Sequence, residues 1–140
     1  MRVMVFGCGR LGATLATDLA SKGHDVTVLD YQSTAFGRLG PEFPGRTVQG
    51  DGLDVDVLQE AGAEGMDAFI ATTSGDNRNL TASQFAHEVF HVPRVVARIS
   101  DPLRGEIFKG RGLHTVSPTV LGADMLYRSL LGKGELVDCD

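Results

Sequence analysis

Short runs of apolar, mostly β-branched residues alternate along the chain with longer segments in which apolar residues recur every three or four positions. The short runs predict strands, and the longer segments predict helices. Their alternation is typical of βαβ units, which build a parallel sheet covered by helices. The pattern predicts six strands, over residues 2–6, 25–30, 46–49, 67–72, 94–99 and 113–117.

The first of these strands is predicted to lie in the middle of the sheet. Its run Val3-Met4-Val5-Phe6 has no polar position, as expected of a strand that is covered on both faces. Residues 31–46 hold several glycines and prolines, so any helix there is expected to be short and irregular. The other connections predict helices over residues 10–22, 54–61, 77–91, 102–109 and 120–131.

Two of the predicted helices differ in how their apolar residues are distributed. The helix over 77–91 has a single apolar stripe, which consists of Ala82, Phe85, Ala86 and Val89. We therefore expect it to bury one face. The apolar residues of the helix over 120–131 point in nearly every direction around its axis. A one-sided surface helix does not need such a distribution, so we expect another surface to cover this helix.

Composition places the chain among ordinary globular domains. Its 140 residues are 42% hydrophobic and 22% charged, enough for one domain with a sizeable core. The net charge is −5 and no basic run occurs, which argues against nucleic acid or an anionic membrane as the main partner. Neither a membrane span nor a signal peptide is apparent, so we expect a cytoplasmic location.

Two features of the sequence could indicate a metal site, but each favours another interpretation. Cys8 and Cys139 lie near opposite ends of the chain, too few for a disulfide framework or a cysteine-rich metal site, so both are expected to be reduced thiols. Residues 87–91 match the zinc-protease pattern H-E-x-x-H. At about 100° per residue, His87 and His91 fall opposite the apolar stripe. We expect both to face water, and no third ligand is evident.

A glycine-rich loop directly follows the first strand and opens the first helix. It reads Gly7-Cys8-Gly9-Arg10-Leu11-Gly12, a G-x-G-x-x-G pattern. Gly7 permits a tight turn, Gly9 lets a pyrophosphate approach the backbone, and Gly12 lets the helix pack closely on the sheet. The helix N-terminus offers free N–H groups and a partial positive charge to a phosphate.

Asp30 completes this fingerprint, at the end of the second strand and 18 residues beyond Gly12. Its carboxylate can accept hydrogen bonds from ribose hydroxyls, and no Arg or Lys follows in Tyr31-Gln32-Ser33, which favours a free 2′-hydroxyl over a 2′-phosphate. The pattern predicts a single α/β domain with a Rossmann-like, doubly wound, six-stranded parallel sheet of order 3-2-1-4-5-6. We expect this domain to bind a nucleotide.

Further polar residues are predicted at the carboxyl ends of the strands, where ligands of open parallel sheets bind. Asp51 follows the third strand, and Thr72, Thr73 and Ser74 follow the fourth. For Thr73, Ser74 and the nearby Asp76, capping of the next helix is an equally plausible role.

Two arginines are also candidates for the site. Arg98 lies near the end of the fifth strand. Because a lone buried guanidinium is costly, Arg98 must reach solvent, a phosphate, or an acid such as Asp101. Arg10 points out of the glycine loop, where it either clamps a phosphate or belongs to the surface.

Together these motifs resemble the N-terminal domain of the RCK family, also called TrkA-N or KTN, whose members regulate potassium channels and transporters. The resemblance extends from residue 1 to about residue 131. It is carried by the glycine loop, Asp30, Gly50-Asp51, Thr72-Thr73, Asp76, Asn79 and the run over 95–99. It implies a nucleotide-binding domain over 1–131, with a C-terminal crossover helix, and a tail over 132–140. Gly52 departs from the family, which often has Ala there.

The resemblance implies a non-catalytic regulatory subunit in the cytoplasm that binds NAD(H) or ATP/ADP and signals to a potassium-transporter membrane subunit. It assigns residues 7–11 to the phosphates, Asp30 to the ribose, Asp51 and residues 72–74 to the surroundings of the adenosine, and Arg98 to a phosphate or ribose. It also implies a homo-oligomer, either a dimer or a ring. In that assembly Arg10 reaches a neighbouring subunit's nucleotide, and the last helix packs against a second subunit.

A small NAD-dependent oxidoreductase is the alternative, because a fold alone does not decide function. A dehydrogenase needs a proton donor or acceptor beside the hydride acceptor. No Tyr-x-x-x-Lys pair occurs in the sequence, and neither His24 nor His114 has an evident position facing the cofactor. These observations favour the regulatory domain.

Overall fold

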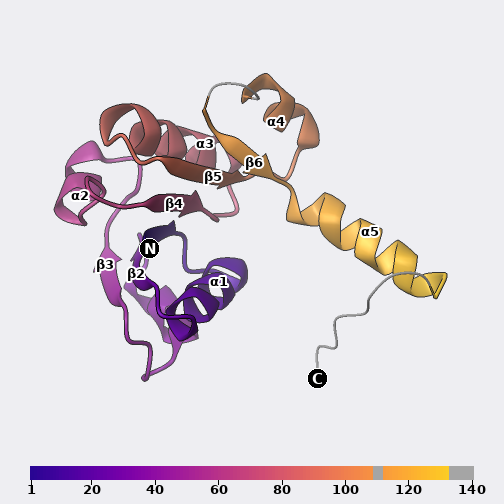
Figure 1. Cartoon of the computed structure of the whole chain (residues 1–140), viewed down its shortest axis with the longest axis horizontal. Helices are drawn as coiled ribbons and strands as arrows, with labels where there is room; N and C mark the ends of the chain where they lie inside the picture. The colour runs from indigo at the N-terminus through magenta and orange to yellow at the C-terminus, as the bar shows by residue number, and fades with distance from the viewer. Residues whose placement is uncertain (109–111, 133–140) are drawn as a thin grey trace.

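The computed structural model describes residues 1–108 and 112–132. They form one six-stranded, all-parallel sheet in the order β3-β2-β1-β4-β5-β6, with helices on both faces (Figure 1). The predicted Rossmann-like fold and strand order are therefore confirmed. The predicted helix end at Lys109, the second cysteine, Cys139, and the tail from residue 133 onwards lie outside the described residues.

The elements lie within a few residues of their predicted ranges. The strands are β1 (Arg2–Phe6), β2 (Asp25–Asp30), β3 (Arg46–Gln49), β4 (Ala68–Ala71), β5 (Arg94–Arg98) and β6 (His114–Val116). The helices are α1 (Arg10–Ser21), α2 (Val55–Glu60), α3 (Asp76–Gln84), α4 (Pro102–Phe108) and α5 (Pro118–Leu130). The segment rich in glycine and proline forms the short 3₁₀ helix η1 (Ser33–Leu39), and α3 continues into the π-helical turn η2 (Phe85–Val89).

The first strand is central, as its unbroken apolar run predicts. It pairs with β2 along its whole length and with β4 from Val3 to Phe6. From Val3 onwards, all of its side chains are buried. The strand order reverses between β1 and β4, and in sheets of this kind the carboxyl ends of the strands at such a point form a ligand-binding crevice.

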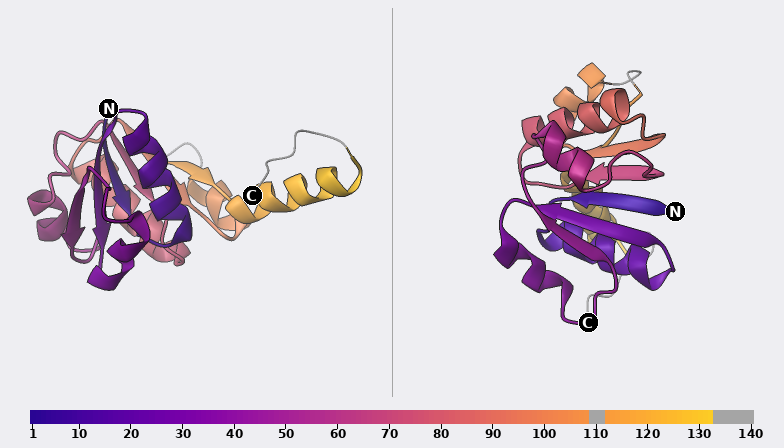
Figure 2. Two further views of the ribbon diagram at one scale, coloured as in Figure 1. Left: turned by 90° about the horizontal axis from the view of Figure 1, so that it is seen from below. Right: turned by 90° about the vertical axis from the view of Figure 1, so that its left-hand side faces the viewer.

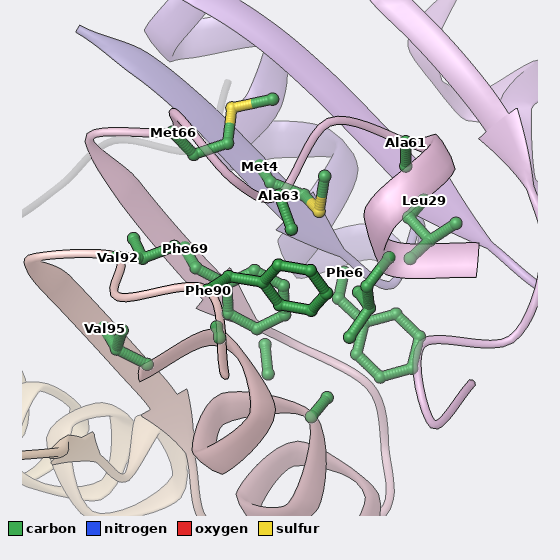
Figure 3. Close-up of a cluster of buried hydrophobic side chains, with 14 of the residues drawn as sticks. Met4, Phe6, Leu29, Ala61, Ala63, Met66, Phe69, Phe90, Val92 and Val95 are labelled. Carbon is green, nitrogen blue, oxygen red and sulfur yellow. The ribbon is translucent and has the colours of Figure 1, made fainter. Parts of the chain in front are cut away.

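Each face of the sheet has its own hydrophobic core. On one face α1 and η1 pack through Ala13, Ala16, Ala35 and Leu39. On the other, α2 and α3 cover a larger cluster that joins Met4, Phe6, Leu29, Leu58, Phe69, Ala82, Ala86, Phe90 and Val95 (Figures 2 and 3). This arrangement leaves the carboxyl ends of the central strands open.

The π-helical turn η2 overturns two predictions for this part of the chain. A π turn holds one residue more than an α turn, so every later residue is rotated around the axis. Val89, predicted in the apolar stripe, is 48% exposed. His87, predicted to face water, is partly buried, and its ring fills the space where a side chain at Gly112 would lie. His91 is exposed, as predicted, and has a left-handed backbone with φ 56°.

The last helix, α5, extends away from the body of the domain (Figures 1 and 2). None of its residues is buried, and its large apolar side chains are among the most exposed of the described chain. Among the described helices, α5 included, none is both long and apolar enough to cross a membrane.

Candidate functional site: a cationic cleft at the glycine loop

A cleft of about 600 Å³ opens at the carboxyl ends of the central strands. It contains all the predicted site residues except Gly12, which lies beneath the loop. The predicted residues in its wall are Gly7, Cys8, Gly9, Arg10, Leu11, Asp30, Asp51, Thr72, Thr73, Ser74 and Arg98. The fold thus brings together residues that are distant in sequence. The cleft is also lined by Phe6, Tyr31, Gln32, Ala35, Arg38 and Arg78, which were not predicted as site residues.

The three glycines of the loop have different surroundings. Gly7 has φ +104°, in the left-handed region that favours glycine. A Cβ at Gly12 would overlap the Gly7 carbonyl oxygen, so α1 lies directly against the loop. A Cβ at Gly9 would have no protein atom within 4 Å. The protein's own packing therefore does not require glycine at this position, and the open space above Gly9 fits the approach of a phosphate.

The first turn of α1 directs its N–H groups at this space. The N-terminal N–H groups of an α-helix have no partner within the helix. In the described chain no side chain caps this end, where Gly9 is the N-cap residue. Free N–H donors and the helix dipole together attract an anion. The loop thus has the donors that a phosphate group needs.

Asp30 fixes the glycine loop from the neighbouring strand. Its Oδ2 accepts a hydrogen bond from the Cys8 backbone N–H at 2.7 Å, and its Oδ1 accepts one from the Gln32 N–H at 2.8 Å. Each carboxylate oxygen has a second lone pair, so Asp30 can hold the loop and still accept from a ribose hydroxyl.

Cys8 lies beneath this contact and is fully buried. Burial raises the pKa of its thiol, and the nearby Asp30 charge raises it further, while the Arg38 guanidinium acts in the opposite direction. Arg38 Nη1 also donates to the Cys8 carbonyl oxygen at 3.3 Å. A buried thiol with a raised pKa is a poor nucleophile, so Cys8 has a packing role in this loop.

Thr72 and Asn79 hold the opposite wall of the cleft. Thr72 Oγ1 donates to the Gly7 carbonyl at 2.9 Å, which joins the end of β4 to the glycine loop. Asn79 is fully buried; its Oδ1 accepts from the Thr73 N–H at 2.9 Å, and its Nδ2 donates to the carbonyls of Thr73 at 2.8 Å and Arg98 at 2.9 Å. The loop after β4 is therefore fixed to the ends of β1 and β5.

The alternative capping role of Thr73, Ser74 and Asp76 does not occur in this structure. Gly75 is the N-cap of α3 and no side chain caps it in the described chain. Asp76 instead accepts from the backbone N–H groups of Ser100 at 2.8 Å and Asp101 at 3.1 Å. Burial opposes the ionisation of Asp76, but these two donors, the Ser100 side chain and the Arg104 charge together outweigh it and lower the pKa of the carboxyl.

The charge of the cleft is opposite to that of the whole chain. Four arginines and two aspartates line the cleft, which gives it a net charge of +2 in a chain of net charge −5. Arg98 is held only weakly by the rest of the domain. Its Nη1 makes only long contacts, 3.4 Å to the Thr72 carbonyl and 3.5 Å to the Thr73 carbonyl, and its buried Nε has no partner in the described part of the chain. Its guanidinium can thus receive an anion.

Two arginines of the cleft were not predicted from the sequence. Arg38 lies eight positions after Asp30, and the 3₁₀ turn of η1 brings it back over the loop. The absence of a basic residue in Tyr31-Gln32-Ser33 therefore does not leave this side of the cleft without a cation. Arg78, in the first turn of α3, crosses to Asp51 with Nη2 2.8 Å from Oδ1. Neither belongs to a short motif that could have identified it.

A Rossmann-type domain with a glycine loop and a cationic cleft at its switch point is the class that these observations define. The sequence model of the TrkA-N domain matches residues 3–118, and the chain belongs to this family.

Relatives with high sequence identity are potassium uptake proteins. The Trk system potassium uptake protein TrkA of Streptomyces coelicolor is 46% identical over 134 residues, which are 96% of this chain and 60% of that protein. A TrkA homolog of Methanothermobacter thermautotrophicus is 36% identical over 127 residues, 90% of this chain and 58% of that protein. The chain thus spans about three fifths of the length of these relatives.

Solved structures show the same fold at lower identity. The TrkA-N domain of the Escherichia coli inner membrane protein YbaL has a TM-score of 0.81 at 20% identity, over 92% of this chain and 96% of that one. The GsuK RCK domain has a TM-score of 0.79 at 24% identity, over 93% of this chain and 28% of that one. GsuK has also been solved bound to ADP and bound to NAD.

Proposed function

We propose that this chain is a non-catalytic, nucleotide-sensing domain of a potassium transport system, with NAD(H) or ATP/ADP as its ligand. The observation that carries the proposal is the cationic cleft over an uncapped helix N-terminus, with open space at Gly9 and a carboxylate at Asp30. The names of the TrkA relatives and the ADP and NAD complexes of GsuK support it.

In this proposal residues 1–131 form the sensing domain, and each wall of the cleft holds one part of the nucleotide. The N–H groups of residues 7–11 hold the phosphates, and Asp30 accepts from the ribose. Asp51 and residues 72–74 surround the adenosine. Arg98, whose guanidinium makes only long contacts within the domain, pairs with a phosphate or a ribose oxygen, and Arg10 at the rim is available to the nucleotide of a neighbouring subunit.

The partners in this proposal are a membrane subunit that conducts potassium and a second copy of this chain. The exposed apolar surface of α5 supports an oligomer, a dimer or a ring, in which the helix packs against the next subunit. The domain would then act at the cytoplasmic face of the membrane, through contact with the membrane subunit.

The proposal is tested by nucleotide binding to the wild-type chain and to Asp30→Ala. We expect NAD, NADH, ADP or ATP to raise the melting temperature, because a ligand that binds only the folded state stabilises it. Asp30→Ala should remove most of this rise, since it removes both the ribose acceptor and the anchor of the Cys8 N–H. A melting curve that no adenine nucleotide shifts would refute nucleotide binding.

The oxidoreductase alternative makes a different prediction from the same binding site. It requires sustained, substrate-dependent oxidation of NADH, whereas a sensing domain binds the nucleotide without consuming it. The described residues of the cleft wall include neither histidine nor lysine. We therefore expect no turnover of NADH with added carbonyl substrates, and turnover would favour the enzyme.

A further inference from the structure

Residues from three elements lie against one another on one side of the cleft. They are Phe6 at the end of β1, Asp51 in the loop after β3, and Arg78 in the first turn of α3. Arg78 Nη2 donates to Asp51 Oδ1 at 2.8 Å. The guanidinium carbon of Arg78 lies 5.9 Å from the centre of the Phe6 ring, within the range of a cation–π contact. Arg78 therefore crosses from α3 towards β3 and is held there by two contacts.

On this side of the cleft, the planar group that a ligand can reach is the Arg78 guanidinium and not the Phe6 ring. Phe6 is only 1% exposed, so a ligand has no ring face to stack on. The side chains of Arg78 and Asp51 are 41% and 40% exposed, and both line the cleft. Asp51 is itself fixed, because its Oδ1 also accepts from the Leu53 N–H at 3.0 Å.

Gly52 explains how Phe6 comes to support the arginine. A Cβ at Gly52 would lie 2.7 Å from two carbons of the Phe6 ring, closer than real Cβ atoms approach their neighbours. The absence of a side chain at Gly52 therefore makes room for Phe6, and the ring fills the space beneath Arg78.

The strand order places this group beside the base of a bound nucleotide. Phosphates belong at the glycine loop after β1 and the ribose at Asp30 after β2, so the next strand outward is β3, whose end carries Asp51. Asp51 already neutralises Arg78, which makes this guanidinium less suited to a phosphate than Arg98. Arginine guanidinium planes stack on aromatic faces.

We propose that Arg78 receives the purine base of the nucleotide by stacking, with Asp51 and the Phe6 ring as its supports. This inference rests on the proposed nucleotide binding and adds the residue that contacts the base. It requires that Arg78 interact with the base and not with the phosphates, a difference that two ligands can separate.

Calorimetric titration of the whole chain with ADP and with inorganic pyrophosphate tests this inference. Arg78→Ala and Arg78→Lys should each weaken ADP binding by about tenfold, the size of one lost cation–π or stacking contact, and change pyrophosphate binding by less than about twofold. Arg2→Ala is the matched control, because Arg2 pairs with Asp25 at 3.8 Å as a half-exposed arginine outside the cleft. It should leave both affinities unchanged.

Three results would overturn the inference. An equal loss of both ligands in Arg78→Ala would assign the residue to the phosphates. Wild-type ADP affinity in Arg78→Lys would show that charge, and not the flat guanidinium, is what the ligand needs. Unchanged ADP affinity in both variants would leave Arg78 without a role at the base. Failure of the wild-type chain to bind ADP would instead refute the proposed function itself.

Discussion

Gly9 and Gly12 stand three positions apart in one loop and are glycines for different reasons. At Gly12 a Cβ would overlap the Gly7 carbonyl and would lie 2.6 Å from Thr72 Oγ1, so the fold itself excludes a side chain. At Gly9 the backbone is extended, with φ −78° and ψ −168°, and the space around it is open. Gly12 is therefore needed for packing, whereas Gly9 leaves room for a ligand to approach the loop.

Alanine at these two positions should therefore separate stability from binding. Gly12→Ala should lower the free energy of unfolding by about 1–3 kcal/mol, because the methyl group overpacks the contact between α1 and the loop. Gly9→Ala should change it by less than about 0.5 kcal/mol, as at open surface positions, and yet weaken ADP binding by about tenfold or more, because the methyl group occupies the approach of the phosphates. Urea unfolding and ADP titration of both variants would measure this. A Gly9→Ala variant with wild-type ADP affinity would contradict it.

Asp76 shows how one carboxylate joins two elements. It begins α3, where its charge also interacts favourably with the helix dipole, and it accepts from two backbone N–H groups in the loop after β5. Its pKa is lowered by these donors, so the folded state favours the ionised form. The stability that Asp76 contributes is fully present above the unfolded carboxyl pKa of about 4, and it is lost as the pH falls through the lower folded pKa.

Asp76→Asn should lower the free energy of unfolding at pH 7 by about 1 kcal/mol, because only one of the two amide atoms can accept a hydrogen bond. Solvent around this partly exposed site screens the charge and keeps the loss small. The difference from the wild type should shrink below about pH 4, where the aspartate of the unfolded chain is already protonated. Asp56→Asn is the control, since Asp56 also lies in the first turn of a helix, α2. Thermal unfolding at pH 7 and pH 3 would measure both; equal losses at the two pH values would contradict the role of the charge.

At the scale of elements, the sequence predicts what depends on local pattern and misses what depends on packing. The strands, their order and the glycine loop follow from hydrophobic runs and one spaced motif. The approach of Arg38 and Arg78 to the cleft depends on how η1 and α3 lie over the sheet, which no short pattern encodes. The π turn η2 could not be predicted from a local pattern either, because a regular period of 3.6 residues does not show where one extra residue enters the helix.

The π turn makes a measurable difference between two valines. Val89 belongs to the predicted apolar stripe but is 48% exposed, whereas Val92 is buried at the end of the same segment. Val89→Ala should change the free energy of unfolding by less than about 0.5 kcal/mol, and Val92→Ala should lower it by about 2 kcal/mol through lost burial and a residual cavity. Urea unfolding of the two variants would measure these changes. A larger loss in Val89→Ala than in Val92→Ala would indicate a regular α-helix in which Val89 faces the core.

At the scale of the whole molecule, α5 is the described helix that does not pack into the body of the domain. The two cores flank the sheet, and the cleft is held by contacts within the domain, but α5 contributes no buried residue to either core. Leu126 and Leu130 are 70% and 85% exposed. Exposed apolar surface of this kind marks a site of interaction with another molecule. In the proposed oligomer, a second copy of the chain covers this surface of α5.

Oligomer formation should therefore depend on the apolar residues of α5 and not on the stability of the domain. Leu126→Glu and Leu130→Glu should each shift light scattering at micromolar concentration from an oligomer to a monomer, because burying an unpaired carboxylate at an interface is costly. Ser129→Glu, an exposed polar position of the same helix, should have a smaller effect. Because α5 adds no residue to the hydrophobic clusters of the described chain, ADP should still raise the melting temperature of the monomeric variants. A wild-type chain that scatters as a monomer would show that α5 does not pair copies of this chain, and variants that lose ADP binding would show that the cleft is complete only in the oligomer.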